Sequence, residues 1–201
     1  MAALTISRGL AEPCRDQAAL LYMEAFRPLL QPLLGDGPRG LDLLARSMNP
    51  THAFVAIHAG QLTGLAGFQD AAGSLLDIGL PAMVQSYGLP GGSLRYLAMG
   101  LLLSRSRQPD TLLMDGIAVA PECRGQGIGT QLLPVVCEHA REGSYREVRL
   151  DVLDNNPRAR ALYERSGFVA VKQRSYPFLQ RYFGFSAVTE MRRPPVSAAC
   201  R

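Results

Sequence analysis

A glycine-rich turn between two apolar segments, at residues 116–130, constrains the fold of this chain more than any other feature. Residues 112–119 form a short apolar run typical of a buried strand, and 128–141 has apolar residues at helical spacing. Glycines let backbone N–H groups approach a ligand closely, and the first turn of a helix presents unpaired amides with partial positive charge. The pattern predicts a strand–loop–helix unit that binds a phosphate or diphosphate.

The spacing of these glycines differs from the common nucleotide-binding patterns. No Lys-Ser or Lys-Thr follows the loop, and the third glycine comes one residue too early for GxGxxG. Arg124, at the start of the loop, adds a positive charge that favours an anionic ligand. The alternative interpretation is a plain tight turn between a strand and a helix.

Composition excludes several classes of protein. The 201 residues are 47% hydrophobic and 19% charged, which is typical of a soluble globular protein, and their number suits a single domain over 1–201. The net charge is only +4, and acidic residues alternate with basic ones at 141–142 and 146–147, so we expect no nucleic-acid partner.

Cysteine spacing and apolar runs indicate the compartment. The cysteines have no CxxC pair or Cys/His cluster, so we expect no metal site and no disulfide framework. We recognise no signal peptide, and no apolar run reaches the ~20 residues of a membrane helix. These features predict a cytoplasmic protein without a membrane partner.

The remaining pattern predicts a mixed α/β domain. Strands are expected at 4–7, 52–57, 62–68, 112–119, 147–153, 168–174 and 187–191. Helices are expected at 13–34, with prolines that end or kink it, and at 41–48, 128–141 and 157–166. The long connection 71–110 should contain its own helices, at 75–85 and 94–104, on either side of a Gly/Pro breaker at 88–92. Residues 194–201 are expected to form a mobile tail.

Two segments resemble the signatures of the GCN5-related N-acetyltransferase (GNAT) family. Residues 124–129, Arg-Gly-Gln-Gly-Ile-Gly, are similar to its diphosphate loop Arg/Gln-x-x-Gly-x-Gly/Ala. Residues 156–168 are similar to its second signature, Asn-x-x-Ala-x-x-Leu-Tyr-x-x-x-Gly-Phe. The resemblance implies the GNAT acyl-CoA N-acyltransferase fold: a mixed, twisted sheet splayed at the CoA site, with helices on both faces. The segment 71–110 would be a helical insertion between the third and fourth strands.

The resemblance also implies acetyl-CoA as co-substrate, without a metal. A bulge at Gly116 would splay the strand, and the backbone of Ile117, Ala118 and Val119 would hold the pantetheine arm, with one amide facing the thioester oxygen. Asn156 would reach the pantetheine, cap the following helix, or do both. The diphosphate would be bound by Arg124, Gly125, Gln126, Gly127, Ile128, Gly129 and Thr130.

The candidates for proton transfer are Tyr163, Asp115 and Asp151, with Asp77, in the segment 71–110, as a further option for the base. By resemblance, Tyr163 is the acid that protonates the departing CoA thiolate, and the alternative is an aromatic residue at the edge of the core. Asp115, beside the expected bulge, and Asp151, on the next strand, are candidate bases; for each the alternative is a strand-edge carboxylate without a catalytic role. Asp151 stands where ribosomal-protein N-terminal acetyltransferases of this family carry a glutamate.

The resemblance implies transfer of an acetyl group to a primary amine of a small molecule or peptide, by direct attack in a ternary complex. Two alternatives stay open: a non-catalytic acyl-CoA-binding domain, and transfer of a longer acyl group. We expect the insertion 71–110 to determine acceptor selectivity or, through its apolar part at 94–103, to form a homodimer surface.

Overall fold

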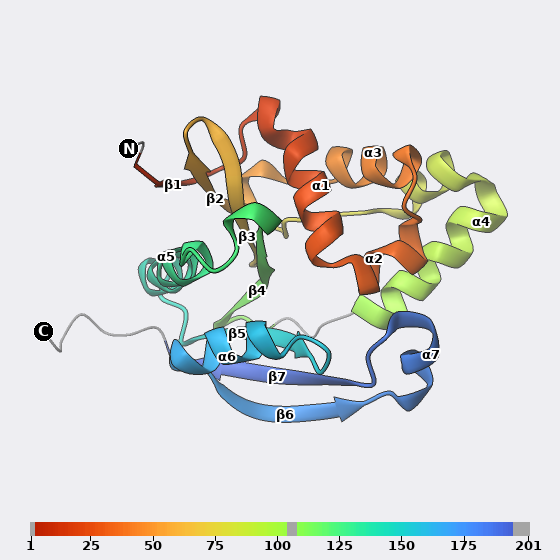
Figure 1. Ribbon diagram of the computed structural model, residues 1–201. Coiled ribbons are helices and arrows are strands. Elements are labelled where there is room, and N and C mark those ends of the chain that lie inside the picture. The colour runs from red at the N-terminus through yellow and green to blue at the C-terminus, as the bar shows by residue number, and fades with distance from the viewer. Residues whose placement is uncertain (1–2, 104–107, 195–201) are drawn as a thin grey trace, which may run out of the picture.

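The computed structural model describes residues 3–103 and 108–194, which form a seven-stranded mixed sheet (Figure 1). The strand order is β1-β2-β3-β4-β5-β7-β6, and every neighbouring pair is antiparallel except β4–β5. The strands are β1 (Thr5–Arg8), β2 (Ala53–His58), β3 (Gln61–Gln69), β4 (Thr111–Val119), β5 (Glu147–Leu153), β6 (Val169–Ser175) and β7 (Ala187–Arg193). The predicted mixed α/β fold is confirmed; the expected tail falls almost wholly outside the described residues.

Helices cover both faces of this sheet (Figure 1). One core lies under α1 (Arg15–Ala25), α2 (Arg27–Leu34), α3 (Pro38–Arg46) and α4 (Leu80–Leu103). The other lies under α5 (Ile128–Glu142) and α6 (Pro157–Arg165). Successive residues of β2 point into the two cores in turn, Val55 into the first and Phe54 into the second, because side chains alternate along a strand. The short α7 (Gln180–Phe183) lies between β6 and β7.

The helix expected at 13–34 is two helices. The chain leaves helical geometry at Phe26, with φ −112° and ψ 23°, and α2 begins at once with Pro28 in its first turn. Proline has no N–H to donate to the preceding turn, so it suits the start of a helix and interrupts a longer one. Pro32 is accommodated inside α2. Among the described residues, three α-helices therefore precede β2, where the sequence analysis expected two helices.

The described part of the connection 71–110 contains helical structure, as expected, in α4, but this helix begins later than the first helix predicted there. Leu75 is not helical: its amide bonds to Phe68 and its carbonyl accepts from Asn49. The breaker is confirmed at Gly88, whose φ of 76° and ψ of 166° divide α4 into two helical parts. The second part starts immediately, with Pro90 near its beginning, where a missing N–H is tolerated.

The insertion packs outside α2 and α3. The Tyr87 hydroxyl donates to the Leu34 carbonyl at 2.5 Å, and Arg95 donates to the Leu33 carbonyl at 2.6 Å. Leucines at helical spacing remain exposed on α4: Leu94, Leu97 and Leu101. That this apolar part forms a homodimer surface, or that the segment 71–110 determines acceptor selectivity, remains a prediction.

Candidate functional site

A bulge in β4 opens the sheet. Gly67 pairs with Gly116 and Phe68 pairs with Met114, which leaves Asp115 as the extra residue. Gly116 has φ 140°, and a Cβ there would lie 2.3 Å from Cζ of Phe26. Only glycine fits this position, because the backbone is in a region that other residues avoid and the ring lies against it.

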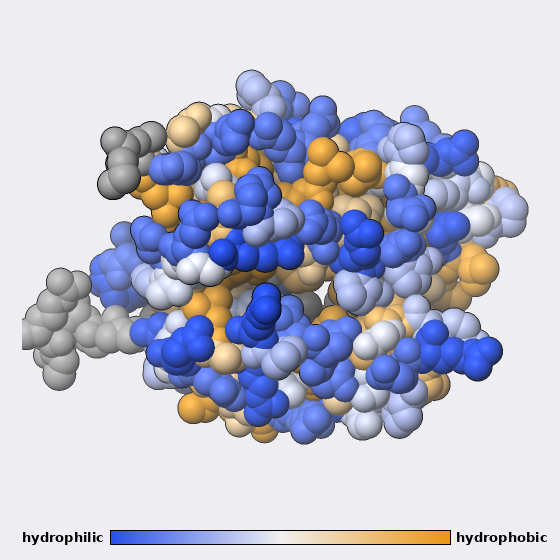
Figure 2. Space-filling model, in the orientation of Figure 1, coloured by the Kyte–Doolittle hydropathy of each residue, from blue (hydrophilic) through white to orange (hydrophobic). Residues whose placement is uncertain are grey.

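Beyond the bulge, β4 and β5 separate. Their parallel pairing runs from Thr111↔Glu147 to Met114↔Leu150 and ends there. Past this point β4 continues to pair with β3, up to Val119↔Gly64, so one edge of β4 has no strand neighbour among the described residues. Backbone groups along that edge are available to a ligand. Figure 2 shows a hollow crossing this face, between the half that holds β4 and α5 and the half that holds α6 and β7.

The glycine-rich loop leads from β4 into α5 as the pattern predicts. Gly125 and Gly127 have φ of 82° and 80°, and a Cβ at either would meet no atom within 4 Å. These glycines are thus required by backbone conformation, and they face open space rather than a packed neighbour. The loop is shaped to let a ligand approach the main chain.

The start of α5 leaves amides for such a ligand. Gly127 occupies the N-cap position without a side-chain capping bond, and the helical ladder begins with the Gln131 amide bonding to the Gly127 carbonyl at 3.0 Å. The amides of Ile128, Gly129 and Thr130 therefore have no acceptor within the helix. With the helix dipole, this is the arrangement that binds phosphate.

Arg124 ties the loop to the first helix. Its Nε donates to the Val119 carbonyl, and its guanidinium contacts the Glu24 carboxylate on α1, both at 3.1 Å. The Arg124 side chain is about half exposed, so its guanidinium can contact a phosphate while the loop stays folded. Gln126 bonds instead to the Glu122 carbonyl at 3.0 Å, which braces the turn.

The second signature lies on α6, next to this loop. A Cβ at Gly129 would lie 3.2 Å from Leu162, so the helices α5 and α6 approach closely there. The Asn156 side chain accepts from the Ala159 amide at 3.1 Å and caps α6. The capping role considered for Asn156 is thus observed.

Tyr163 is packed on the α5–α6 side of the sheet. Its side chain is only 6% exposed, and its ring lies 5.9 Å from the ring of Phe168. The Phe168 amide bonds to the Tyr163 carbonyl, closing the helix at Gly167, whose φ is 84°. The ring is therefore held firmly, which suits a core residue and a positioned acid alike.

Asp151 lies in a buried network of charges that the sequence analysis did not foresee. Its carboxylate is 6% exposed and lies 3.6 Å from the guanidinium groups of both Arg149 and Arg174. Glu190, the residue of β7 that pairs with Asp151, contacts Arg149 at 3.1 Å and Arg174 at 3.9 Å. The available signal was the alternation on β5, where Arg149 and Asp151 fall between buried apolar residues.

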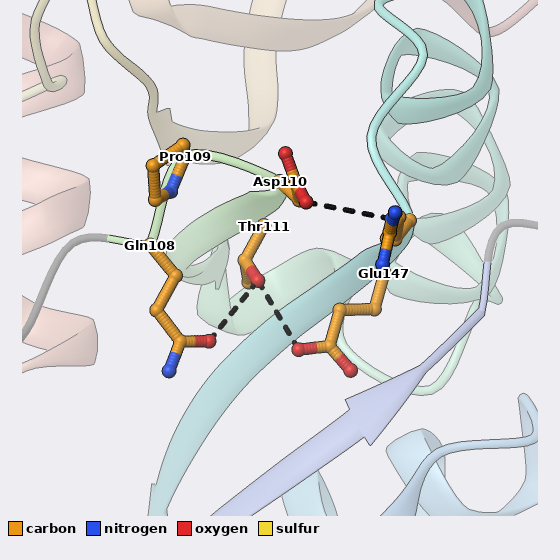
Figure 3. Close-up of a pocket in the computed structure, with 6 residues that line it drawn as sticks. Gln108, Pro109, Asp110, Thr111 and Glu147 are labelled. Atoms are coloured by element: carbon orange, nitrogen blue, oxygen red, sulfur yellow. Dashed lines mark hydrogen bonds and ion pairs between the residues drawn. The ribbon is translucent and has the colours of Figure 1, made fainter.

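A cavity marks the opposite end of β4 and β5. It is lined by residues at the start of the two strands, where Thr111 bonds to Gln108 and to Glu147 (Figure 3). Asp110 also forms an ion pair with Arg146 there, at 3.4 Å. This cavity lies on the paired side of the strands, so it does not belong to the splayed site.

Two further observations concern a metal site and a membrane-spanning helix, neither of which the sequence analysis predicted. Within residues 3–103 and 108–194, no three His, Cys, Asp or Glu side chains lie where they could hold a metal ion. Over the same residues, no helix combines the length and apolar character needed to span a membrane.

Comparison with known proteins identifies the family. The model described as "Acetyltransferase (GNAT) family" matches residues 21–168, which include both signatures, the bulge and the loop. This chain belongs to the GNAT family. The match ends at Phe168, the last residue of the second signature.

Solved GNAT structures share its fold. The ribosomal-protein-S18-alanine N-acetyltransferase from Escherichia coli has a TM-score of 0.58 at 18% identity, covering 99% of this chain and 98% of that chain. A protein from Salmonella typhimurium, solved with its cofactor acetyl-CoA, has a TM-score of 0.62 at 18% identity, covering 98% and 97%. At this identity the likeness concerns the fold alone.

Among curated proteins, the thialysine N-epsilon-acetyltransferase of Bos taurus is 43% identical over 56 residues. These cover 28% of this chain and 33% of the cattle protein, so the matched part spans about a third of that relative.

Proposed function

We propose that this GNAT protein transfers the acetyl group of acetyl-CoA to a primary amine by direct attack in a ternary complex. The observation that carries the proposal is the set of uncapped amides at residues 128–130, placed where β4 leaves β5. An anion bound at this helix start would have its attached chain directed along the open edge of β4.

Acetyl-CoA would then be held by main-chain groups. Its diphosphate would accept hydrogen bonds from the loop at 124–130, with Arg124 supplying charge. Its pantetheine arm would pair with the open edge of β4 at residues 117–119, in place of the missing strand. Asn156 caps α6 with its side-chain oxygen, and its side-chain amide nitrogen would donate to the same arm.

The chemistry needs one base and one acid. Asp151 or Asp115 would take a proton from the acceptor ammonium, and the neutral nitrogen would attack the thioester carbon. An amide of β4 at Ile117 or Val119 would stabilise the oxyanion, an interaction whose loss typically raises the barrier by about 3–4 kcal/mol. As the C–S bond breaks, Tyr163 would give its proton to the CoA thiolate. The acceptor nitrogen would lose its second proton on becoming an amide, and that proton would restore the tyrosine hydroxyl.

We place the protein in the cytoplasm. The described cysteines Cys14, Cys123 and Cys137 are all free thiols, which suits a reducing compartment. Fractionation of the native host, with detection by antibody, tests this assignment.

The test of the proposed function has two stages. Calorimetry with CoA and with acetyl-CoA should register binding of both, and thiol release from acetyl-CoA should then depend on an added amine. Binding without thiol release, across amino acids, polyamines, aminoglycosides and peptides, would favour the non-catalytic acyl-CoA-binding alternative. Faster release from butyryl-CoA or octanoyl-CoA than from acetyl-CoA would favour a longer acyl group.

A further inference from the structure

Arg174, on β6, has unused hydrogen-bonding capacity beside the proposed base. Its guanidinium lies 3.6 Å from Asp151 and 3.9 Å from Glu190, distances longer than those of hydrogen bonds. Its Nε is buried and makes no hydrogen bond with the described residues. The side chain is nevertheless 33% exposed, so a ligand can reach it.

The arginine on the neighbouring strand, Arg192, makes closer contacts with acidic residues than Arg174 does. On β7, Arg192 donates to Glu190 at 2.7 Å and also contacts Glu147. Glu190 is therefore satisfied by Arg192, and it has Arg149 at 3.1 Å as a second counter-charge. Arg174 is not needed to neutralise Glu190, and its loose contacts do not use the planar fork of its donors.

The guanidinium fork matches a carboxylate. Arginine binds planar oxyanions through two parallel N–H donors, and these charge-assisted bonds are roughly twice as strong as neutral ones. A buried donor left without a partner is unfavourable, so a ligand that fills it gains binding energy. The open donors of Arg174 lie on the same sheet face as Asp151.

We infer that Arg174 binds a carboxylate of the acceptor, so that the acceptor class is a small amino acid. This inference rests on the proposed function, with Asp151 as the base. Because Arg174 and Asp151 are only 3.6 Å apart, the carboxylate and the amine they bind must be separated by few atoms. An α- or β-amino acid meets that condition, whereas a polyamine has no group for Arg174.

The experiment compares matched acceptors. Thiol release from acetyl-CoA is measured with the common amino acids, with their carboxamides, and with spermidine. We expect at least one amino acid to have a kcat/KM about 10- to 100-fold above that of its own amide, the range typical of a charge-assisted pair. An amide used as well as its acid, or a preference for spermidine or peptides, overturns the inference while leaving the proposed function intact.

Substitutions of Arg174 test whether this side chain causes the preference for the acid over the amide. Arg174→Gln should remove the preference for the acid over the amide by raising KM for the acid, and Arg174→Lys should restore part of it. The matched control is Lys172→Gln, which removes the same charge from an exposed position on the same strand. Equal losses for acid and amide in Arg174→Gln indicate a structural role and contradict the inference. If acetyl-CoA binds but no amine is acetylated, both the proposed function and this inference fail.

Discussion

Asp115 and Asp151 are the first residues beyond the last paired positions of β4 and β5, Met114 and Leu150. Asp115 is also the extra residue of the bulge that ends the pairing. The fold therefore brings both candidate bases to the point where the two strands diverge. A thioester held on the open edge of β4 would have its reacting end there.

Replacing the candidate bases one at a time distinguishes them. Asp151→Asn should lower kcat by about 10²- to 10⁴-fold, because a general base contributes in that range, and Asp115→Asn should lower it less. Steady-state thiol release at several pH values measures both. A larger loss of kcat in Asp115→Asn than in Asp151→Asn would identify Asp115, on β4, as the base.

Tyr163→Phe should reduce kcat by about 10²-fold or more and leave the affinity for acetyl-CoA nearly unchanged. The ring keeps its packing against Phe168, so the fold should be retained, as circular dichroism would check. Tyr96→Phe, on the outer part of α4, serves as the control for loss of a hydroxyl group. Unchanged turnover in Tyr163→Phe removes this residue from the mechanism.

Gly127→Leu should abolish binding of CoA, measured by calorimetry. The matched control is Gly60→Leu, since Gly60, in the β2–β3 turn, has φ 79° and equally open surroundings. Both substitutions place a side chain in the left-handed region, at a cost of about 1–2 kcal/mol. Equal stability losses with a binding loss only at Gly127 support the diphosphate site; binding retained by Gly127→Leu contradicts it.

Gly116→Ala should destabilise the protein by about 2–4 kcal/mol, through its positive φ and the overlap with the Phe26 ring. Phe26→Leu in the same chain should recover part of this loss, because the smaller side chain removes the overlap. Urea unfolding of the two single variants and the double variant measures the coupling. Strict additivity would show that the ring is not the obstacle.

Asp154 makes a pH-dependent contribution to the stability of the folded protein, and this contribution can be tested. Hydrogen bonds from the Ser186 hydroxyl and amide lower the pKa of this carboxyl below its ordinary value of 3.8. A lowered pKa in the folded state stabilises the protein above pH 3.8 and stops doing so as the pH falls through the folded-state value. Ser186→Ala should therefore reduce the melting temperature at pH 7 and have a diminishing effect toward pH 2. A difference that grows on acidification contradicts this assignment.

The local parts of the site could be predicted from sequence because their signals are local. Gly116, the glycines of the loop and the Asn156-Pro157 cap each reflect a backbone requirement at one position, which the residue type itself records. The start and end of β5 were likewise predicted at 147 and 153, from apolar alternation.

The charge network could not be predicted, because it depends on strand order. Arg174 and Glu190 meet Asp151 only because β7 lies between β5 and β6, and no local period encodes that order. The prolines of 13–34 predicted an end or kink in this helix, but the exact place of the break, at Phe26, was not predicted. Its ring lies against Gly116, a residue far along the chain, and a sequence window centred on the helix does not contain that contact.

The position of β7 also governs how the sheet is assembled. In the described sheet β6 touches no strand except β7, so β6 has no place to dock until residues 187–193 are available. A nascent chain that ends at Ser186 exposes the bare edge of β5 together with an unattached β6, a state open to pairing with other chains. This side of the sheet is therefore completed only after β7, the strand that joins β5 and β6, has been synthesised.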